Sequence, residues 1–369
     1  MARLATTLAG LQFPNPVLCG AGPQSDGPDA ITTAAHHGAG GVVARTLLPK
    51  PFAPAPEPSV VPYGKDGLLT CQRGSPRRLT EHLPSVGVPV IASLAATAAD
   101  AGEMGARLIA AGAQALELAT AFLTWPESVE ALQALRRAVS VPVIAKLSLR
   151  HGEDIADRAL AVEPFVDAFT CMSGFGPVLD IDIEQKGAPR LSDPYGYGWL
   201  SGAPIHPIAV RTVFEVARKV KKPIIASGGA MTVRDVVEFL EAGASLVQVT
   251  TAALLKGPAI FGTLTTDLNT WLDEHGYDSV AAIHGLYVKR FGQGQRVVLR
   301  AEEAPVLDAD KCVRCAICGQ VCYYDAIDAP LKQLPVVTPE RCFQCGLCVS
   351  ACPEGALSFR PRAEVTMRL

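Results

Sequence analysis

Two short stretches near the end of the chain share one cysteine spacing. Residues 312–322 read CVRCAICGQVC, and residues 342–353 read CFQCGLCVSACP. Each stretch has the pattern C-x2-C-x2-C-x3-C, in which three closely spaced thiolates bind one iron–sulfur cube and the fourth binds the other cube. The spacing therefore predicts two [4Fe–4S] clusters with two crossed ligand sets: Cys312, Cys315, Cys318 and Cys352, and Cys342, Cys345, Cys348 and Cys322.

Other uses of these cysteines fit the pattern less well. Zinc sites usually take their ligands in separated pairs, and thiols in close C-x2-C triplets pair poorly as disulfides. Three of the eleven cysteines, Cys19, Cys71 and Cys171, remain outside the two runs. So many thiols favour a reducing compartment, the cytoplasm. We expect residues 301–369 to form a bacterial-type two-cluster ferredoxin domain.

The bulk composition excludes several classes of protein. The chain has 369 residues, more than one ordinary domain, and 49% of them are hydrophobic. A formal net charge of −3 gives no sign of a nucleic-acid or membrane-surface partner. No apolar run approaches the ~18 residues that span a bilayer. The first residues, MARLATTLAGLQF, lack the apolar core of a signal peptide.

The first 300 residues alternate between short apolar runs and helix-length segments with a 3.6-residue period. Eight parallel strands with helical crossovers predict a (β/α)8 barrel. An open doubly wound sheet would show a glycine-rich fingerprint after its first strand, and the sequence there, Cys-Gly-Ala-Gly-Pro, lacks it. The expected strands are Pro16–Gly20, Gly41–Arg45, Val88–Leu94, Ala115–Leu118, Val141–Lys146, Ala168–Met172, Pro223–Ser227 and Leu246–Val249. The expected helices include Ala98–Ala111, Glu127–Val139, Pro207–Val220 and Val233–Ala242.

The last two expected strands end in turns that suit a phosphate group. Ser227 is followed by Gly228 and Gly229, and the eighth strand by Thr250 and Thr251. Barrels commonly bind phosphate at these two turns through backbone N–H groups, although a glycine pair is also found in simple tight turns. Because iron–sulfur clusters carry single electrons, a flavin is the cofactor that best matches them.

Several further motifs, taken together, resemble the dihydroorotate dehydrogenase superfamily. The order of barrel and tail is similar to the FMN-containing part of dihydropyrimidine dehydrogenase. The resemblance covers nearly the whole chain and implies FMN as the cofactor. The residues that carry it are 9–11 (AGL), 15–17 (NPV), 92–93 (AS), 146–148 (KLS), 180–184 (DIDIE), 201–207 (SGAPIHP), 228–229 (GG), 250–252 (TTA) and 256–258 (KGP).

The resemblance also implies roles for individual residues. Ala21 and Gly22 are expected to line the flavin, and Arg45, where the family usually has Lys, and Thr46 to contact its ring. Ser93 belongs to the expected cofactor-binding set. Lys146 is expected at the flavin edge, where a cation stabilises the anionic reduced form and so takes part in catalysis. The expected phosphate-binding residues are Gly202, Gly228, Gly229, Thr250 and Thr251, the family usually having Gly in place of Thr250.

The substrate-facing positions depart from the family pattern. Where the family has an Asn-x-Ser-Cys-Pro-Asn-like segment, residues 118–124 read LATAFLT, so that Ala119 replaces an amide. Cys171 and Met172 stand where the family has Asn-Ser or Asn-Thr, and residues 69–74 after the second strand read LTCQRG. A site without these amides is not expected to prefer a pyrimidine.

The usual proton-transfer residue is also missing. The family carries a Cys or Ser on a loop after strand four, but here Pro126 already begins the next helix. Cys71 and Cys171 are the candidates for the catalytic group, with Tyr195 and Tyr197 in the loop after strand six. A buried structural cysteine is the alternative for each thiol.

We therefore predict a cytoplasmic FMN and iron–sulfur oxidoreductase that passes electrons between an external carrier and a small unsaturated substrate. The carrier would be a ferredoxin or an NAD(P)H-oxidising flavoprotein subunit, and the chain would form a homo- or hetero-oligomer. Two alternatives remain: a ferredoxin-driven reductase of an activated double bond, and an electron-transfer subunit of a larger flavoprotein complex.

Overall fold

The chain divides into two compact units, Met1–Lys289 and Arg290–Leu369. The computed structural model describes residues 3–49, 58–71, 82–152, 154–191, 195–291, 295–300, 304–359 and 363–368. The sequence analysis placed the boundary after residue 300, whereas this division falls after Lys289, so that β17 (Gln295–Arg300) and its partner β22 (Ala363–Arg368) both belong to the second unit.

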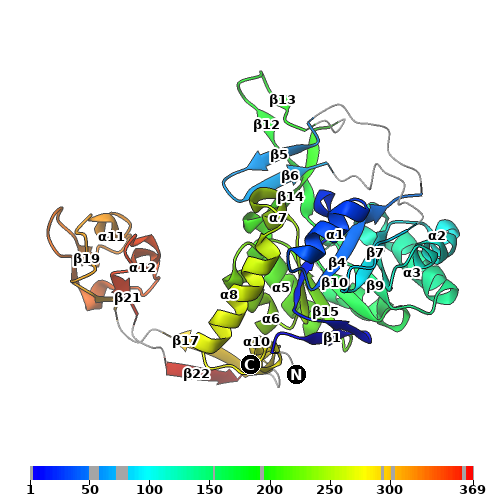
Figure 1. Ribbon diagram of the computed structural model, residues 1–369. Coiled ribbons are helices and arrows are strands. Elements are labelled where there is room, and N and C mark those ends of the chain that lie inside the picture. Colours follow the sequence, from blue (N-terminus) through cyan, green and yellow to red (C-terminus); the bar gives the residue numbers. More distant parts are fainter. Residues whose placement is uncertain are drawn as a thin grey trace. The chain divides into compact units, whose positions relative to one another are not determined.

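The first unit is a closed barrel of eight parallel strands, as the sequence predicts (Figure 1). Each expected apolar run matches one barrel strand to within two residues at either end, and most of the strand residues are buried. Continuous burial explains why these segments are apolar throughout rather than alternating. In barrel order the strands are β10 (Ala168–Cys171), β15 (Ile224–Ser227), β16 (Leu246–Val249), β3 (Val17–Cys19), β4 (Gly41–Leu47), β7 (Val90–Leu94), β8 (Ala115–Ala119) and β9 (Val143–Lys146).

Helices cross over between the strands, and their starts follow from local sequence. Thr124 caps the start of α3 (Trp125–Ala138) with a capping box, in which the side chains of Thr124 and Glu127 each accept a hydrogen bond from the other residue's backbone N–H. Thr232 and Asp235 make the same arrangement at α6 (Val233–Glu241). The other helices of this unit are α1 (Pro28–His36), α2 (Ala98–Ala110), α4 (Ile155–Val162), α5 (His206–Ala217), α7 (Thr251–Lys256), α8 (Ile260–Glu274) and α9 (Val280–Ile283), with α10 (Leu286–Phe291) at the boundary.

The N-terminal hairpin closes one end of the barrel. Its strands β1 (Thr6–Leu8) and β2 (Leu11–Phe13) bring Leu8 and Phe13 into one buried cluster with inward-facing side chains of the barrel strands, such as Leu18 and Ile91. A second, larger cluster lies between the strands and the surrounding helices. The active end must therefore be the opposite one, where the strands finish.

A small antiparallel sheet, which the sequence analysis did not predict, stands beyond that opposite end (Figure 1). Its strand order is β11 (Phe175–Leu179), β14 (Tyr197–Gly202), β6 (Gly67–Thr70) and β5 (Val60–Tyr63). A hairpin of β12 (Ile181–Asp182) and β13 (Ala188–Pro189) extends from it. Two loops distant in sequence thus join, because Trp199 pairs with Thr70 and Ser201 with Leu68.

The second unit repeats one local design around its two cysteine runs. Each run leads into a short helix, α11 (Ile317–Gln320) or α12 (Leu347–Ala351). Residues 314 and 344, the second after the first cysteine of each run, both have positive φ, 57° at Arg314 and 58° at Gln344. Short two-stranded ladders complete the unit: β18 (Val306–Leu307) with β21 (Leu357–Ser358), and β19 (Ile327–Asp328) with β20 (Val336–Val337).

Among the residues that the structure describes, no helix combines the length and apolar character needed to cross a bilayer.

Candidate active site and cluster-binding unit

A cavity opens at the carboxyl ends of the barrel strands. Its walls come from the strand ends, from the loops that follow them and from the small sheet, which contributes Thr70 and Trp199. The cavity brings together most of the cofactor residues expected from the sequence: Ala21, Gly22, Arg45, Thr46, Lys146, Gly202, Gly228, Gly229, Thr250 and Thr251. Ser93 is fully buried and bonds to the Thr46 hydroxyl with an Oγ–Oγ1 distance of 2.9 Å.

One side of the cavity is formed by glycines, Gly202 at the end of β14 and Gly228 and Gly229 directly after β15. Gly202 and Gly229 have φ values of +85° and +83°, a region that side chains rarely adopt. A Cβ on Gly229 would lie 2.6 Å from the carbonyl oxygen of Gly202, and one on Gly202 would lie 2.2 Å from that of Asp66. The chain therefore keeps its backbone close and bare here, which suits a phosphate group held by main-chain N–H groups.

The threonine that replaces the usual glycine at position 250 is accommodated by two other glycines. A Cβ on Gly20 would lie 2.4 Å from Thr250 Oγ1, and one on Gly22 would lie 2.9 Å from its Cγ2. The Thr250 side chain therefore packs against bare backbone after β3. This packing leaves Thr250 and Thr251 both on the cavity wall.

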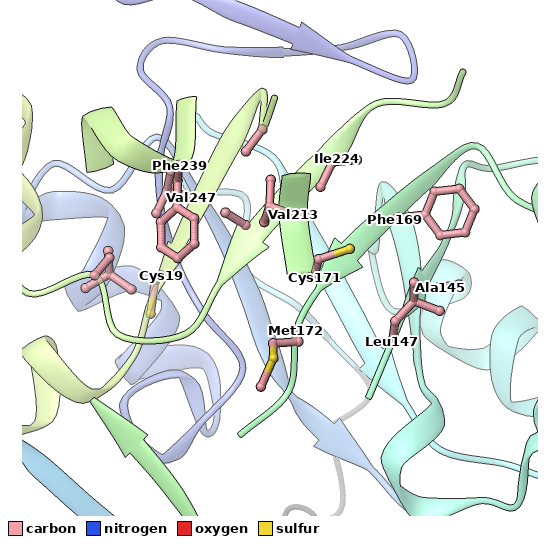
Figure 2. Packing of buried hydrophobic residues seen from close by; sticks show 14 of the residues in the cluster. Cys19, Ala145, Leu147, Phe169, Cys171, Met172, Val213, Ile224, Phe239 and Val247 are labelled. Carbon is pink, nitrogen blue, oxygen red and sulfur yellow. The ribbon is translucent and has the colours of Figure 1, made fainter. Parts of the chain in front are cut away.

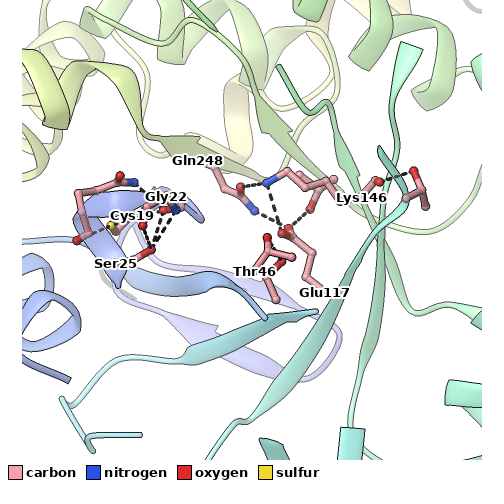
Figure 3. Close-up of polar contacts among 12 residues, drawn as sticks. Cys19, Gly22, Ser25, Thr46, Glu117, Lys146 and Gln248 are labelled. Atoms are coloured by element: carbon pink, nitrogen blue, oxygen red, sulfur yellow. Dashed lines mark hydrogen bonds and ion pairs between the residues drawn. The ribbon is translucent and has the colours of Figure 1, made fainter. Parts of the chain in front are cut away.

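The floor of the cavity is polar and charged (Figure 3). Lys146 Nζ lies 3.3 Å from Glu117 Oε1 and donates to Gln248 Oε1 at 2.8 Å. Glu117 Oε2 accepts hydrogen bonds from Gln248 Nε2 and Thr170 Oγ1, each at 2.7 Å. Lys146 and Gln248 line the cavity, whereas the Glu117 side chain is completely buried beneath them.

Arg45 lines the cavity but its guanidinium is already engaged. Nη1 lies 3.0 Å from Asp26 Oδ2, and both side chains are mostly buried. The ion pair ties the end of β4 to the segment after β3, so Arg45 supports this wall of the cavity. The structure thus shows Arg45 in an ion pair with Asp26. Its expected contact with the flavin ring stays a prediction.

The structure separates the two candidate thiols for proton transfer. Cys71 follows β6 and lies on the cavity wall together with Thr70 and Trp199. Cys171 has no exposed surface, is not among the lining residues, and packs in the outer cluster toward Val213 of α5 (Figure 2). Burial raises the pKa of the Cys171 thiol far above its usual range. Of the two thiols, Cys71 lines the cavity and Cys171 does not.

The two tyrosines named with these thiols lie away from the described cavity wall. Tyr195 is 76% and Tyr197 47% exposed, and their ring centroids are 5.7 Å apart. They belong to the surface around β14 rather than to the lining of the cavity.

The short connection after β8 is as the sequence predicts. β8 ends at Ala119, one turn of 3-10 helix covers Thr120–Phe122, and α3 begins at Trp125. Ala119 and Phe122 both line the cavity. Within the described part of the chain, this side of the cavity carries no amide.

The eight cysteines of the second unit surround two small cavities. One is lined by Cys312, Cys315, Cys318 and Cys352, and the other by Cys322, Cys342, Cys345 and Cys348. Backbone N–H groups already point at the sulfurs, with distances of 3.4 Å from Ala326 N to Cys322 and 3.2 Å from Ala356 N to Cys352. Such contacts stabilise cluster thiolates, so the donor set fits two four-thiolate clusters.

Gln248 at the cavity floor and Glu117 buried beneath it are two residues that the sequence analysis did not single out. Both stand inside otherwise apolar strand segments, ALELA at 115–119 and LVQV at 246–249. A polar residue within a buried strand requires a partner. That signal alone could have pointed to the barrel interior.

The barrel has a glycine-lined cavity with a lysine at its floor, and the second unit has two cavities lined by cysteines. These features define the class as an oxidoreductase that combines a phosphate-bearing cofactor with iron–sulfur chemistry. Residues 106–272 match the family described as "Dihydroorotate dehydrogenase", and residues 335–358 match "4Fe-4S binding domain". Curated relatives extend this match over most of the chain. A catalytic subunit of dihydroorotate dehydrogenase B (NAD(+)) from Thermococcus kodakarensis is 32% identical over 306 residues, covering 78% of this chain and 98% of that protein.

The corresponding subunit from Pyrococcus furiosus is 33% identical over 302 residues, 76% of this chain and 98% of that protein. The chain belongs to the dihydroorotate dehydrogenase family. It is accordingly an oxidoreductase that acts on CH–CH bonds with FMN and [4Fe–4S] cofactors.

Proposed function

We propose that the barrel cavity binds FMN and a small unsaturated or partly reduced substrate, and that the C-terminal unit carries the electrons. The observation that supports this most strongly is the convergence of the two glycine turns and Lys146 on one cavity. FMN supplies hydride exchange on the substrate side and single-electron exchange on the cluster side. A lined cavity of this kind favours an enzyme over a purely electron-transferring subunit.

Different residues are proposed to bind different parts of the cofactor. The bare backbone at Gly202, Gly228 and Gly229 is proposed to bind the phosphate, with Thr250 and Thr251 beside it. Lys146 is proposed to present its ammonium group to the flavin, where positive charge favours the anionic reduced state. Thr46, fixed by Ser93, is proposed to donate or accept a hydrogen bond at the ring.

We propose two clusters, one for each four-thiol cavity. The support is the partition of the lining residues, since each cavity takes three cysteines from one run and the fourth from the other. This crossed pattern is the one expected for paired cubes. Two adjacent cubes provide a path for single electrons between FMN and an external carrier.

For the substrate, we propose a molecule more apolar than a pyrimidine. Ala119, Phe122, Met172 and Trp199 line the cavity, and their side chains offer little hydrogen bonding to ring amides. Hydroxyl groups such as those of Thr70 and Ser173 also line the cavity, but without amides at positions 119 and 171 it offers a pyrimidine fewer of the hydrogen bonds that would orient it. Each missing substrate bond is worth roughly 0.5–1.5 kcal/mol.

Dihydroorotate is the second candidate substrate. The relatives from Thermococcus and Pyrococcus are named for it, and Cys71 on the cavity wall could accept a proton from a substrate. In this reading Cys71 replaces the loop thiol that the family carries after strand four. The two candidates differ in one measurable respect, the rate with pyrimidines.

The deciding experiment is anaerobic reoxidation of the reduced protein by a panel of unsaturated compounds that includes orotate, uracil and thymine. We expect an apolar enone or similar activated alkene to reoxidise the flavin at least about tenfold faster than any pyrimidine, since two lost hydrogen bonds cost one to two decades. The variant Ala119→Asn restores one amide and should narrow this gap. Fast reoxidation by orotate in the unaltered protein would establish the second candidate instead.

The external carrier is proposed to be a separate protein, either a ferredoxin or an NAD(P)H-oxidising flavoprotein subunit. The relatives' description as catalytic subunits supports the second. We further propose that the protein works in the cytoplasm, because eight thiolates that must stay available for clusters suit a reducing compartment. Co-purification of a tagged chain under anaerobic conditions, followed by assay with NADH and with reduced ferredoxin, tests the carrier.

A further inference from the structure

Four barrel strands contribute one side chain each to the network under the cavity. Glu117 comes from β8, Lys146 from β9, Thr170 from β10 and Gln248 from β16. Gln248 therefore reaches the others across the barrel interior rather than along neighbouring strands. Figure 3 shows Gln248, Lys146 and Glu117 pointing toward one another.

The hydrogen bonds leave little freedom in this network. Glu117 Oε2 accepts from Gln248 Nε2, so the amide of Gln248 must turn its oxygen toward Lys146 Nζ. Lys146 Nζ in turn uses two of its three N–H groups on Glu117 and Gln248. The acid thus fixes both the orientation of the amide and the position of the ammonium group.

Charge compensation matters because the site is deeply buried. The Glu117 side chain is 0% exposed and that of Lys146 is 10% exposed. Removal of one partner of a buried pair leaves the other uncompensated. Glu117 Oε1, 3.3 Å from Lys146 Nζ, therefore supplies the countercharge for the lysine at the cavity floor.

We propose that Glu117 is a positioning residue for the oxidoreductase reaction, which holds Lys146 as a fixed cation against the flavin and locks Gln248 in one orientation. The inference rests on the proposed binding of FMN in this cavity. Glu117 itself does not line the cavity, so it acts through Lys146 and Gln248 and sets how strongly the site favours reduced over oxidised flavin.

The variant Glu117→Gln tests this with little change of shape. The amide oxygen at 117 can then accept from Gln248 Nε2 or from Lys146 Nζ but not from both, so one of these two contacts meets an N–H₂ group instead. Lys146 loses the acceptor that holds its ammonium group against the flavin, and in this proposal the lost position disfavours reduced flavin more than the removal of the buried carboxylate charge favours it. We expect reduced flavin to lose at least tenfold more affinity than oxidised flavin, which lowers the midpoint potential by about 30 mV for a two-electron couple.

Four further variants separate this role from a structural one. Lys146→Met should lower the potential in the same direction, and adding Glu117→Gln to it should have almost no further effect, because the acid acts through the lysine. The swapped pair Glu117→Gln with Gln248→Glu returns a carboxylate to the network and should recover part of the shift. Asp167→Asn is the matched control, since it changes an acid to an amide in the Arg136 ion pair at the other end of the barrel and should leave the potential unchanged.

The measurements are the flavin midpoint potential by anaerobic dye titration and the affinity of the flavin-free protein for FMN by fluorescence. An unchanged or raised potential in Glu117→Gln, when Lys146→Met lowers it, would overturn the inference. If Glu117→Gln does not fold, Thr170→Val removes one donor to Glu117 and should give a smaller shift in the same direction; no shift there overturns the inference as well. Absence of FMN binding by the unaltered protein would instead refute the proposed function.

Discussion

Replacing Gly229 with Val tests the phosphate-binding wall. The backbone at Gly229 has φ +83°, and a Cβ there would lie 2.6 Å from Gly202 O and 2.8 Å from His206 Cβ. A side chain at positive φ costs about 1–2 kcal/mol, and overpacking adds roughly 1–3 kcal/mol. The two glycine turns must therefore move apart, and the bare backbone proposed to hold the phosphate is lost.

The expected result is a selective loss of FMN. Flavin released by denaturation should fall well below that of the unaltered protein, while iron and acid-labile sulfide stay the same because the clusters are held by the second unit. Gly276→Val is the matched control, since Gly276 also has positive φ, +70°, but nothing lies within 4 Å of an added Cβ. Full flavin retention in Gly229→Val would mean that the phosphate lies elsewhere.

Further predictions concern the thiols. Cys352→Ala should abolish the cluster of the first cysteine run and leave about four irons per chain; loss of the second run's cluster instead would refute the crossed assignment. Cys71→Ser should slow proton transfer to or from the substrate by roughly 10²–10⁴-fold, whereas Cys171→Ser should change turnover little, and the reverse order in steady-state rates would exclude Cys71. Burial raises the pKa of the Cys19 thiol to about 12, so the folded chain keeps a proton that the unfolded chain releases above about pH 8.5. Stability should therefore fall between about pH 8.5 and 12 by up to about 1.4 kcal/mol per unit, and thermal unfolding of Cys19→Ala should show a flatter decline; an identical slope would contradict the assignment.

The barrel could be predicted because its signal is local. Runs such as residues 143–146 and 246–249 are short, β-branched and buried on both sides, and helix-length amphipathic segments separate them. The cysteine runs are a stronger signal still, because their spacing alone indicates that they bind iron–sulfur clusters. In both cases the residues that allow the prediction lie in one contiguous segment.

The small sheet beyond the barrel could not be predicted in the same way. It joins β6 to β14 across more than a hundred residues. Each of these strands also pairs with a strand nearer in sequence, β6 with β5 and β14 with β11, but those local pairs do not specify the long-range one. In the structure β11 alternates between exposed and partly buried residues, but its sequence, FGPVL, shows no matching alternation of polar and apolar residues. Long-range pairing of this kind is decided by packing rather than by propensity.

The site was predicted in part. The glycine turns and Lys146 follow from strand ends and from the family resemblance, and the cavity brings them together. Cys171 shows where prediction from the sequence failed. A shift of one residue along a strand decides whether a side chain at the strand end faces the barrel interior or the helices. Thr170 points inward to Glu117, so its neighbour Cys171 points outward.

The most direct test of the account is a count of cofactors in protein purified without oxygen. Two cubes on eight cysteines and one flavin in the barrel predict eight irons, eight acid-labile sulfides and one FMN per chain. Bound zinc without labile sulfide, or cluster-loaded protein that takes up no FMN, would contradict the central claim that one chain joins a flavin barrel to a two-cluster electron path.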